Sequence, residues 1–301
     1  MRILWISATA GNYRSPNVSG GGYNGGGWIS SMQNELAKRD DIKLGIAFCR
    51  NGEPAKVEQD GVVYYPIPHH TKSKRDKILD LFKLNDAARD EVLWPYYEHK
   101  FKEVIEDFKP DVIHIFGSEL YHGLAARVAG NIPMVLHIQG LLSLSIYILL
   151  PPGFSRREYI MSGKGLKGKF YHLQYLAYWK RSAYREKAIL NTVFNVIGRT
   201  DWDRQAMAVL NPKAKYCYGG EILRDVFYEA RERQIPKVPT ITTTISFPTY
   251  KGYDVILKVA NILKNELHLN FQWNVYGNID PDFMEKHIGL SHQDLNINLC
   301  G

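Results

Sequence analysis

A glycine-rich segment near the N-terminus is the part of this sequence with the clearest chemistry. Residues 20–27 read Gly-Gly-Gly-Tyr-Asn-Gly-Gly-Gly, and Trp28, Ile29, Met32 and Leu36 follow with the spacing of one helical face. Glycine has no Cβ, so a ligand can approach its backbone closely, and the start of a helix offers unpaired N–H groups at a positive dipole end. Proteins hold phosphate groups in this way. We therefore expect nucleotide or phosphate-ester binding.

The elements that would position such a ligand follow an alternating pattern. Helical periodicity between short apolar runs, for example over residues 97–108 and 120–128, predicts an α/β fold, with helices on both faces of a parallel sheet. Because ligands bind beyond the carboxyl ends of such strands, residues 117–119, 137–140 and 198–200 are candidate site residues. The predicted strands are residues 3–6, 44–48, 62–65, 112–115, 135–138 and 193–197.

The strand and helix pattern starts again after the polar connection of residues 228–239. A β-branched run over residues 240–247 is followed by a turn and a helix pattern, and further strands are predicted at 271–276 and 295–299. This restart predicts a second Rossmann-like domain. About 65 residues are few for such a domain, so we expect the sequence to be a truncated form of a longer protein.

Composition narrows the class of protein. The three cysteines are widely spaced, which gives no disulfide framework and no paired metal-ligand spacing, so we expect a reducing, cytoplasmic location. The longest apolar stretch, residues 141–150, is far shorter than the roughly 20 residues that span a bilayer.

Basic residues gather at residues 72–77 and 156–187, and the net charge is +7. An anionic membrane face, a phosphorylated substrate, nucleic acid and a merely solvated surface would each explain them. We expect no nucleic-acid partner, because no RNA-binding aromatic signature and no recognition-helix motif is present.

The glycine spacing also matches the dinucleotide fingerprint, with Gly20, Gly22 and Gly25 in the required positions. The context differs, however. About 13 residues separate the first strand from Gly20, and the second strand ends in Cys49 and Arg50 rather than in an acidic residue. An NAD(P)-dependent oxidoreductase therefore stays as a lesser alternative.

Three features together resemble the retaining, sugar-nucleotide-dependent glycosyltransferases of family 4. They are the glycine pair at the start of the first helix, the run Asp-Val-Ile-His at residues 111–114 before a small-residue turn, and Lys251 with Gly252 at the start of the later helix. The resemblance covers nearly all of the chain. It implies a GT-B fold of two Rossmann-like domains, with an acceptor-side domain at residues 1–235 and the first part of a nucleotide-sugar-binding domain at 236–301.

The resemblance also implies the reaction. A hexosyltransferase would move a sugar from a nucleotide-sugar donor to a saccharide or lipid-linked acceptor with retention, in cell-surface polysaccharide or glycoconjugate synthesis. The basic, aromatic segment of residues 156–187 and the apolar stretch of 141–150 suggest a docking surface for the acceptor, or peripheral contact with the anionic inner face of the membrane. No metal and no cofactor is expected, because helix dipoles and a lysine can stabilise the leaving diphosphate and the nucleotide-sugar is itself the substrate.

By the same resemblance, individual residues receive roles. His137 and Lys251 are the catalytic candidates, and Arg199 would supply a cation because Ser246 stands where family members often carry an arginine. The donor diphosphate would contact Gly26, Gly27, Lys251, Gly252 and Arg199; the acceptor or sugar would contact Ser118, Glu119 and Gln139; and the nucleotide would contact Ser246 and Gly277.

Other readings of these residues stay open. His137 fits a core histidine, Glu119 fits a carboxylate that stabilises a helix dipole, and Lys251 fits a surface lysine. The two glutamates, seven residues apart, with which the family recognises ribose and sugar would lie beyond Gly301, which leaves the activity of this chain by itself open. A non-catalytic sugar- or nucleotide-binding protein on the same scaffold is therefore the first alternative.

Overall fold

The computed structural model describes residues 1–14, 27–52, 56–229, 235–247 and 249–301. The chain divides into two compact units, each of which is described by itself. Unit 1 comprises Met1–Leu144 and Leu176–Ala230, and unit 2 comprises Ser145–Tyr175 and Arg231–Gly301. Residues 145–175 thus group with the C-terminal part of the chain. The domain limits 1–235 and 236–301 remain a prediction.

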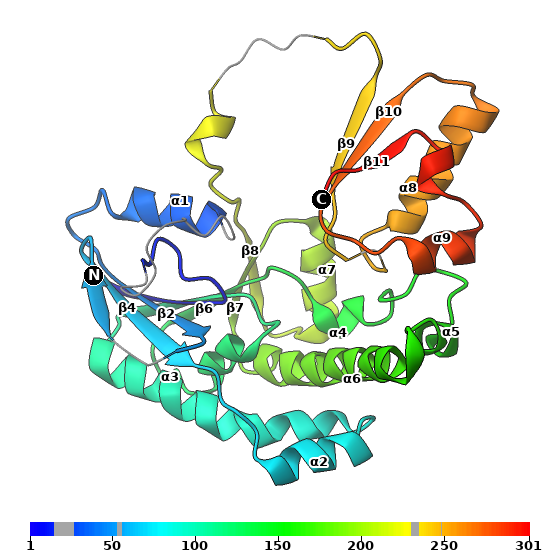
Figure 1. The fold of residues 1–301 in the computed structure, drawn as a ribbon. Coiled ribbons are helices and arrows are strands. Elements are labelled where there is room, and N and C mark those ends of the chain that lie inside the picture. The colour runs from blue at the N-terminus through cyan, green and yellow to red at the C-terminus, as the bar shows by residue number, and fades with distance from the viewer. Residues whose placement is uncertain (15–26, 53–55, 230–234, 248) are drawn as a thin grey trace. The chain divides into compact units, whose positions relative to one another are not determined.

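Unit 1 is built on a sheet of eight strands within the described residues (Figure 1). The order is β3-β4-β2-β1-β5-β6-β7-β8, and neighbouring strands are parallel except for β3 and β4. Chain order reverses at β1, so the topological switch point lies between β1 and β5. This confirms the α/β fold that the sequence predicts. The strands are β1 (Arg2–Ser7), β2 (Lys43–Arg50), β3 (Val57–Gln59), β4 (Val62–Pro68), β5 (Val112–Phe116), β6 (Met134–His137), β7 (Asn195–Gly198) and β8 (Lys215–Tyr218).

Helices cover both faces of this sheet, because alternate residues of each strand point to opposite sides. Trp5 packs with Ile29 on the face that α1 covers, whereas Leu4 and Ile6 pack with Phe101 on the face that α3 covers. The segment at 120–128 forms a 3₁₀ helix rather than an α-helix. The helices are α1 (Gly27–Leu36), α2 (Lys74–Phe82), η1 (Ala87–Leu93), α3 (Trp94–Phe108), η2 (Tyr121–Arg127), α4 (Leu142–Ser145), α6 (Gly165–Leu190), α7 (Asp201–Leu210) and η3 (Asp225–Phe227); α4 and α6 extend into unit 2.

Unit 2 contains a parallel sheet of order β11-β10-β9. Val275 of this sheet and Tyr253 and Leu257 of α8 are fully buried in its core. The predicted strand at 240–247 ends earlier, at Thr244. The elements are α5 (Arg156–Met161), β9 (Thr240–Thr244), α8 (Tyr253–Asn261), the π-helical turn η4 (Ile262–Glu266), β10 (Gln272–Tyr276), α9 (Asp282–Ile288), η5 (His292–Asp294) and β11 (Ile297–Leu299).

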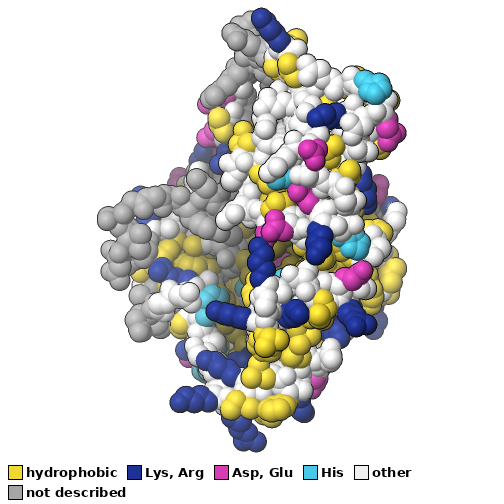
Figure 2. Space-filling view, turned by 45° about the vertical axis from the view of Figure 1, so that its right-hand side comes forward, with side chains coloured by type: hydrophobic (Ala, Val, Ile, Leu, Met, Phe, Trp, Pro, Cys, Tyr) yellow, Lys and Arg dark blue, Asp and Glu magenta, His cyan; other side chains and the backbone are white. Residues whose placement is uncertain are grey.

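Two further features bear on the sequence expectations. Cys49, Cys217 and Cys300 are all free thiols, as the spacing predicts. Among the helices of the described ranges, none combines the length and the apolar character that crossing a membrane requires. The surface carries Lys and Arg side chains beside exposed hydrophobic ones, most visibly in the lower half of the face in Figure 2.

Candidate functional site

Several predicted site residues of unit 1 follow adjacent strands at one edge of its sheet. Ser118 and Glu119 come directly after β5, Gln139 follows β6, and Arg199 follows β7. The parallel register pairs Phe116 with His137 across β5 and β6, so the loops start at the same level. The topology therefore brings these residues together, although their roles toward a ligand stay predictions.

The carboxylate of Glu119 lies close to the backbone of two loops. The backbone N–H groups of Glu119, Ser118 and Gly140 favour its charged form and so oppose the increase in pKa that burial causes. Gly117 has a φ of +90°, and a Cβ there would lie 2.1 Å from Glu119 Oε2, so this position requires glycine. Burial raises the pKa of Glu119 to about 7, and the nearby Glu186 carboxylate adds to the increase. Glu119 can therefore exchange a proton near neutral pH.

Two consecutive residues of α6 fix the turn that carries Glu119. Glu186 is fully buried and accepts hydrogen bonds from Ser118 Oγ at 2.9 Å and from the Ser143 N–H at 2.6 Å. Arg185 Nη2 donates to the Glu119 carbonyl oxygen at 2.9 Å. Burial raises the pKa of Glu186, while these donors oppose the increase.

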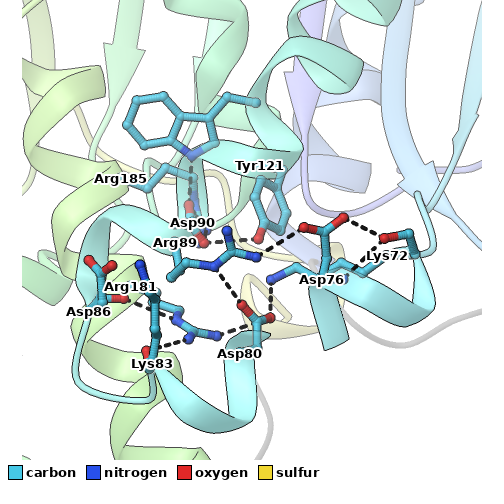
Figure 3. Close-up of polar contacts among 12 residues, drawn as sticks. Lys72, Asp76, Asp80, Lys83, Asp86, Arg89, Asp90, Tyr121, Arg181 and Arg185 are labelled. Carbon is cyan, nitrogen blue, oxygen red and sulfur yellow. Dashed lines mark hydrogen bonds and ion pairs between the residues drawn. The ribbon is translucent and has the colours of Figure 1, made fainter. Parts of the chain in front are cut away.

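Arg185 is in turn held by a buried carboxylate (Figure 3). Its Nη1 lies 2.8 Å from both oxygens of Asp90, which also accept hydrogen bonds from the Trp94 indole at 2.7 Å and the Tyr121 hydroxyl at 2.9 Å. The side chains of Arg185 and Asp90 are 1% and 3% exposed. Such a pair is costly to break from one side only. The position of Glu119 thus depends on a buried polar cluster, through the hydrogen bond of Arg185 to the Glu119 carbonyl oxygen.

His137 lies at the end of β6 with its ring among aromatic side chains. The ring centroid is 5.3 Å from that of Trp28 and 5.7 Å from that of His114. Neither ring nitrogen has a hydrogen-bond partner in the part of the chain that the structure describes. Burial, followed by the charge of Arg199, lowers the pKa of His137 to about 4. The imidazole is therefore neutral at pH 7, with one ring nitrogen as a donor and the other as an acceptor, and both nitrogens are buried.

Arg199 is already partnered in this structure. Its Nη1 forms an ion pair with Glu221, and its Nη2 donates to the Gln139 carbonyl oxygen at 2.9 Å. A diphosphate at this arginine would therefore have to compete with Glu221. The side-chain nitrogen of Gln139 is buried and has no partner among the described residues.

Most of the glycine-rich segment, including Gly26, lies outside the described residues. Gly27 is the first residue of α1, and a Cβ there would lie 3.1 Å from Arg224 Cδ. Gly27 lines a cavity of about 350 Å³ together with Asn34, Lys38 and Arg224. The acidic side chains Glu35 and Asp225 line it too, so the cavity wall carries both positive and negative charges.

In unit 2 the predicted residues lie at the carboxyl edge of the small sheet. Lys251 is exposed, with its Nζ 5.2 Å from the centroid of the Tyr250 ring, and Gly252 precedes α8 with a φ of +79°. Ser246 is exposed as well. Gly277 follows β10 with a φ of +128°, and a Cβ there would lie 1.8 Å from the Ile245 carbonyl oxygen. The backbone, rather than side-chain packing, defines this edge.

Sequence reasoning missed the residues that hold the Glu119 turn. The contacts of Glu186 with Ser118, of Arg185 with Glu119 and of Arg185 with Asp90 join residues 66 to 95 positions apart, and no local pattern links them. One signal was present: on α6 the buried face contains Trp179, Ala183, Glu186 and Leu190, so a carboxylate interrupts an apolar helical stripe.

The strand order and the edge of loops define an α/β fold of the kind that binds nucleotides at its switch point. Among solved structures this fold is similar to those of GT-B glycosyltransferases. A trehalose-6-phosphate structure from Escherichia coli, bound with UDP-2-fluoro glucose, aligns with a TM-score of 0.50 and 13% identity, over 96% of this chain and 68% of that one. A UDP-forming α,α-trehalose-phosphate synthase from Burkholderia vietnamiensis aligns with a TM-score of 0.54 and 9% identity, over 96% of this chain and 68% of that one.

The α,α-trehalose 6-phosphate synthase of Burkholderia multivorans gives a TM-score of 0.51 and 10% identity, over 99% of this chain and 70% of that one. No family model and no curated protein matches the sequence. At these identities the likeness concerns the fold. The chain spans slightly more than two thirds of the length of these three structures.

Proposed function

We propose that this protein is a glycosyltransferase that moves a sugar from a nucleotide-sugar donor to an acceptor with retention. The observation that carries the proposal is the fold likeness over at least 96% of the chain to trehalose-phosphate synthases, one of them bound with a UDP-sugar analogue. Retention and a role in cell-surface polysaccharide or glycoconjugate synthesis rest on the sequence resemblance. The donor is a substrate, and no cofactor or metal is part of the proposal.

The strand-edge residues of unit 1 have the chemistry that the acceptor side of such a reaction needs. Glu119, with a pKa of about 7, can accept a proton from an acceptor hydroxyl group. His137 is neutral and unpartnered among the described residues, so it can hydrogen-bond a sugar hydroxyl without placing a cation beside the oxocarbenium-like transition state. In this proposal Ser118 and Gln139 line the same acceptor or sugar site.

Lys251 has the chemistry that the donor side needs. Its ammonium group is exposed and stands just before α8, whose N-terminal N–H groups favour an anion. We assign it, with Gly252 and the glycines at the start of α1, to the leaving diphosphate, whose negative charge grows in the transition state. Ser246 and Gly277 would face the nucleotide.

The acceptor is proposed to be a saccharide or a lipid-linked saccharide, used in the cytoplasm at the inner face of the membrane. Residues 145–175 of unit 2 support this. They carry five Lys or Arg residues against one Glu, and they expose large apolar side chains such as Ile148, Leu166 and Tyr171. A lipid carrier with a phosphate headgroup complements such a surface.

The test is a thermal-shift screen of the whole chain with UDP, GDP and ADP, their sugar conjugates, and NAD and NADP as controls. A stabilising shift with one nucleoside diphosphate and its sugar supports the proposal, and Lys251→Ala should abolish that shift. With the matching donor, Lys251→Ala should slow transfer on the order of a hundredfold. A shift with NAD or NADP alone would favour the oxidoreductase instead.

A second candidate is a non-catalytic binding protein on the same scaffold. It is favoured by Ser246, an exposed serine where the resemblance expects a diphosphate-binding arginine. Sugar-nucleotide binding without product, measured by chromatography with a range of acceptors, would support it. Product whose anomeric configuration, determined by NMR, matches that of the donor would exclude it and establish retention.

A further inference from the structure

Helix α2 is unusual because none of its residues is buried. Its sequence, Lys-Arg-Asp-Lys-Ile-Leu-Asp-Leu-Phe, separates into two faces at 100° per residue. Asp76 and Asp80 are four positions apart and share one face. Ile78 lies opposite them, between Lys74 and Phe82. The question is which of these faces meets the protein.

The acidic face of α2 is the one that meets the protein (Figure 3). Arg89 contacts Asp76 at 3.0 Å and Asp80 at 3.2 Å, Lys72 contacts Asp80 at 2.7 Å, and Arg181 of α6 contacts Asp80 at 3.3 Å. The side chains of this ion-pair cluster are 12% to 27% exposed, so the surrounding protein partly shields the pairs from water. The two carboxylates of the helix are thus neutralised and turned inward.

The opposite face of α2 is apolar and basic. Ile78, Leu81 and Phe82 are 53%, 46% and 84% exposed. Lys74, Arg75 and Lys77 are exposed on the same side, and within the described ranges none of them has an ion pair. This is the reverse of an ordinary surface helix, which buries its apolar face and exposes its charges. A helix arranged in this way is suited to a partner outside the molecule.

We propose that this face of α2, made of Lys74, Arg75, Lys77, Ile78, Leu81 and Phe82, docks on the surface of an anionic lipid membrane. Cations that flank large apolar side chains on one helical face match such a surface, because the apolar groups enter the acyl boundary while the cations meet lipid phosphates. The inward ion pairs keep the acidic side chains of α2 away from the anionic lipid.

The position of α2 favours a membrane over a folded protein partner. In unit 1, α2 lies outside the layer formed by α3 and α6 (Figure 1), and its apolar side chains Ile78, Leu81 and Phe82 are exposed. A deformable lipid surface can enclose such a projecting helix, whereas a protein partner would need a matching groove. The inference adds a surface of unit 1 to the membrane contact that the proposed function assigns to residues 145–175, and its test does not depend on sugar transfer.

The test is co-sedimentation of the whole chain with vesicles of phosphatidylcholine alone and of phosphatidylcholine mixed with phosphatidylglycerol. The chain should bind the anionic vesicles, and added salt should weaken binding. The triple variant Lys74→Glu, Arg75→Glu, Lys77→Glu should lose at least about tenfold in affinity. The variant Ile78→Ser, Leu81→Ser, Phe82→Ser should lose a similar factor, because the apolar contact is removed. Since these side chains are exposed, thermal unfolding should stay unchanged.

A matched control tests whether membrane binding depends on where the positive charges lie or only on the net charge of the chain. The variant Lys43→Glu, Lys187→Glu, Lys213→Glu changes three exposed residues of unit 1 by the same total charge and should bind like the unchanged chain. A further variant, Arg156→Glu, Arg157→Glu, Lys167→Glu, probes the basic segment of unit 2.

Four results would overturn the proposal. They are no binding to anionic vesicles, equal losses in the α2 and control variants, loss of binding only in the unit 2 variant, and self-association in solution that the α2 variants abolish. The last result would make a second copy of the chain the occupant of this face.

Discussion

The two strand edges of this molecule are built in opposite ways. In unit 1, His137 is buried and Glu119 is partly buried, and the turn that carries Glu119 is held by side chains of a distant helix. In unit 2, Lys251 and Ser246 are exposed, and the closest constraint is a backbone contact between Gly277 and Ile245. The difference indicates that burial tunes proton affinity at one edge, whereas the other edge presents an exposed charge to solvent. It also separates substitutions that damage the fold from those that damage only binding.

The largest expected effect is on the buried cluster of unit 1. Arg185→Met leaves the Asp90 carboxylate buried without its cation, so the free energy of unfolding should fall by about 3–5 kcal/mol. Urea unfolding followed by circular dichroism measures this. The control Arg204→Met removes an exposed pair with Asp201 and should cost less than about 1 kcal/mol. Equal losses in the two variants would contradict the view that unit 1 depends on this cluster.

The backbone constraint of unit 2 should give the next largest effect. Gly277→Ala places a Cβ 1.8 Å from the Ile245 oxygen at a φ of +128°, so we expect a loss of about 3 kcal/mol or more. Gly289→Ala is the comparison, since Gly289 has a φ of +73° and no neighbouring atom within 4 Å. It should lose only about 1 kcal/mol. If both variants unfold at the same denaturant concentration, the close approach at Gly277 is not what constrains this edge.

A pH-dependent effect distinguishes Glu119. Its pKa is raised from 4.5 to about 7, so between these pH values the folded state binds more protons than the unfolded state. Protonation of Glu119 therefore stabilises the fold at low pH, and this stabilisation is lost as pH rises through 7. Glu119→Gln does not titrate. It should therefore match the unchanged chain below pH 4.5 and gain relative stability above it, by at most about 1.4 kcal/mol per pH unit up to pH 7.

Thermal unfolding of both proteins from pH 4 to 8 measures this difference. The pKa values of His114, His122 and His137 are lowered to about 3 to 4, which destabilises both proteins below pH 6.5 and cancels in the comparison. A difference that does not change with pH would contradict a raised pKa at Glu119.

The smallest effect on stability should come from Lys251. Its side chain is exposed, so Lys251→Ala should change the free energy of unfolding by no more than about 0.5 kcal/mol. Chemical denaturation without ligand measures this. Large destabilisation would mean that Lys251 supports the fold of unit 2. A loss of donor binding in Lys251→Ala would then reflect damage to the fold and not the loss of a contact with the donor.

Local patterns predict much of this fold but little of what supports the site. Buried strands such as β5 and β6 show as apolar runs, and their parallel pairing places Glu119 and His137 at one edge. The contacts of Glu186 and Arg185 with the turn after β5 cross 66 to 68 positions of sequence, and only tertiary packing creates them. Helix α2 shows a further limit. Its pattern predicts two faces, but the ion pairs of Asp76 and Asp80, not the apolar residues, decide which face turns inward.

Trp28 places an intrinsic fluorophore at the strand edge of unit 1. Its indole ring lies edge-on, with its centroid 5.3 Å from those of both His137 and Phe116, at the start of the helix that follows the glycine-rich segment. Indole emission responds to the polarity of its surroundings and to a neighbouring imidazole. A change in tryptophan emission that Trp28→Phe abolishes would therefore report ligand arrival beside His137 in real time, without a label.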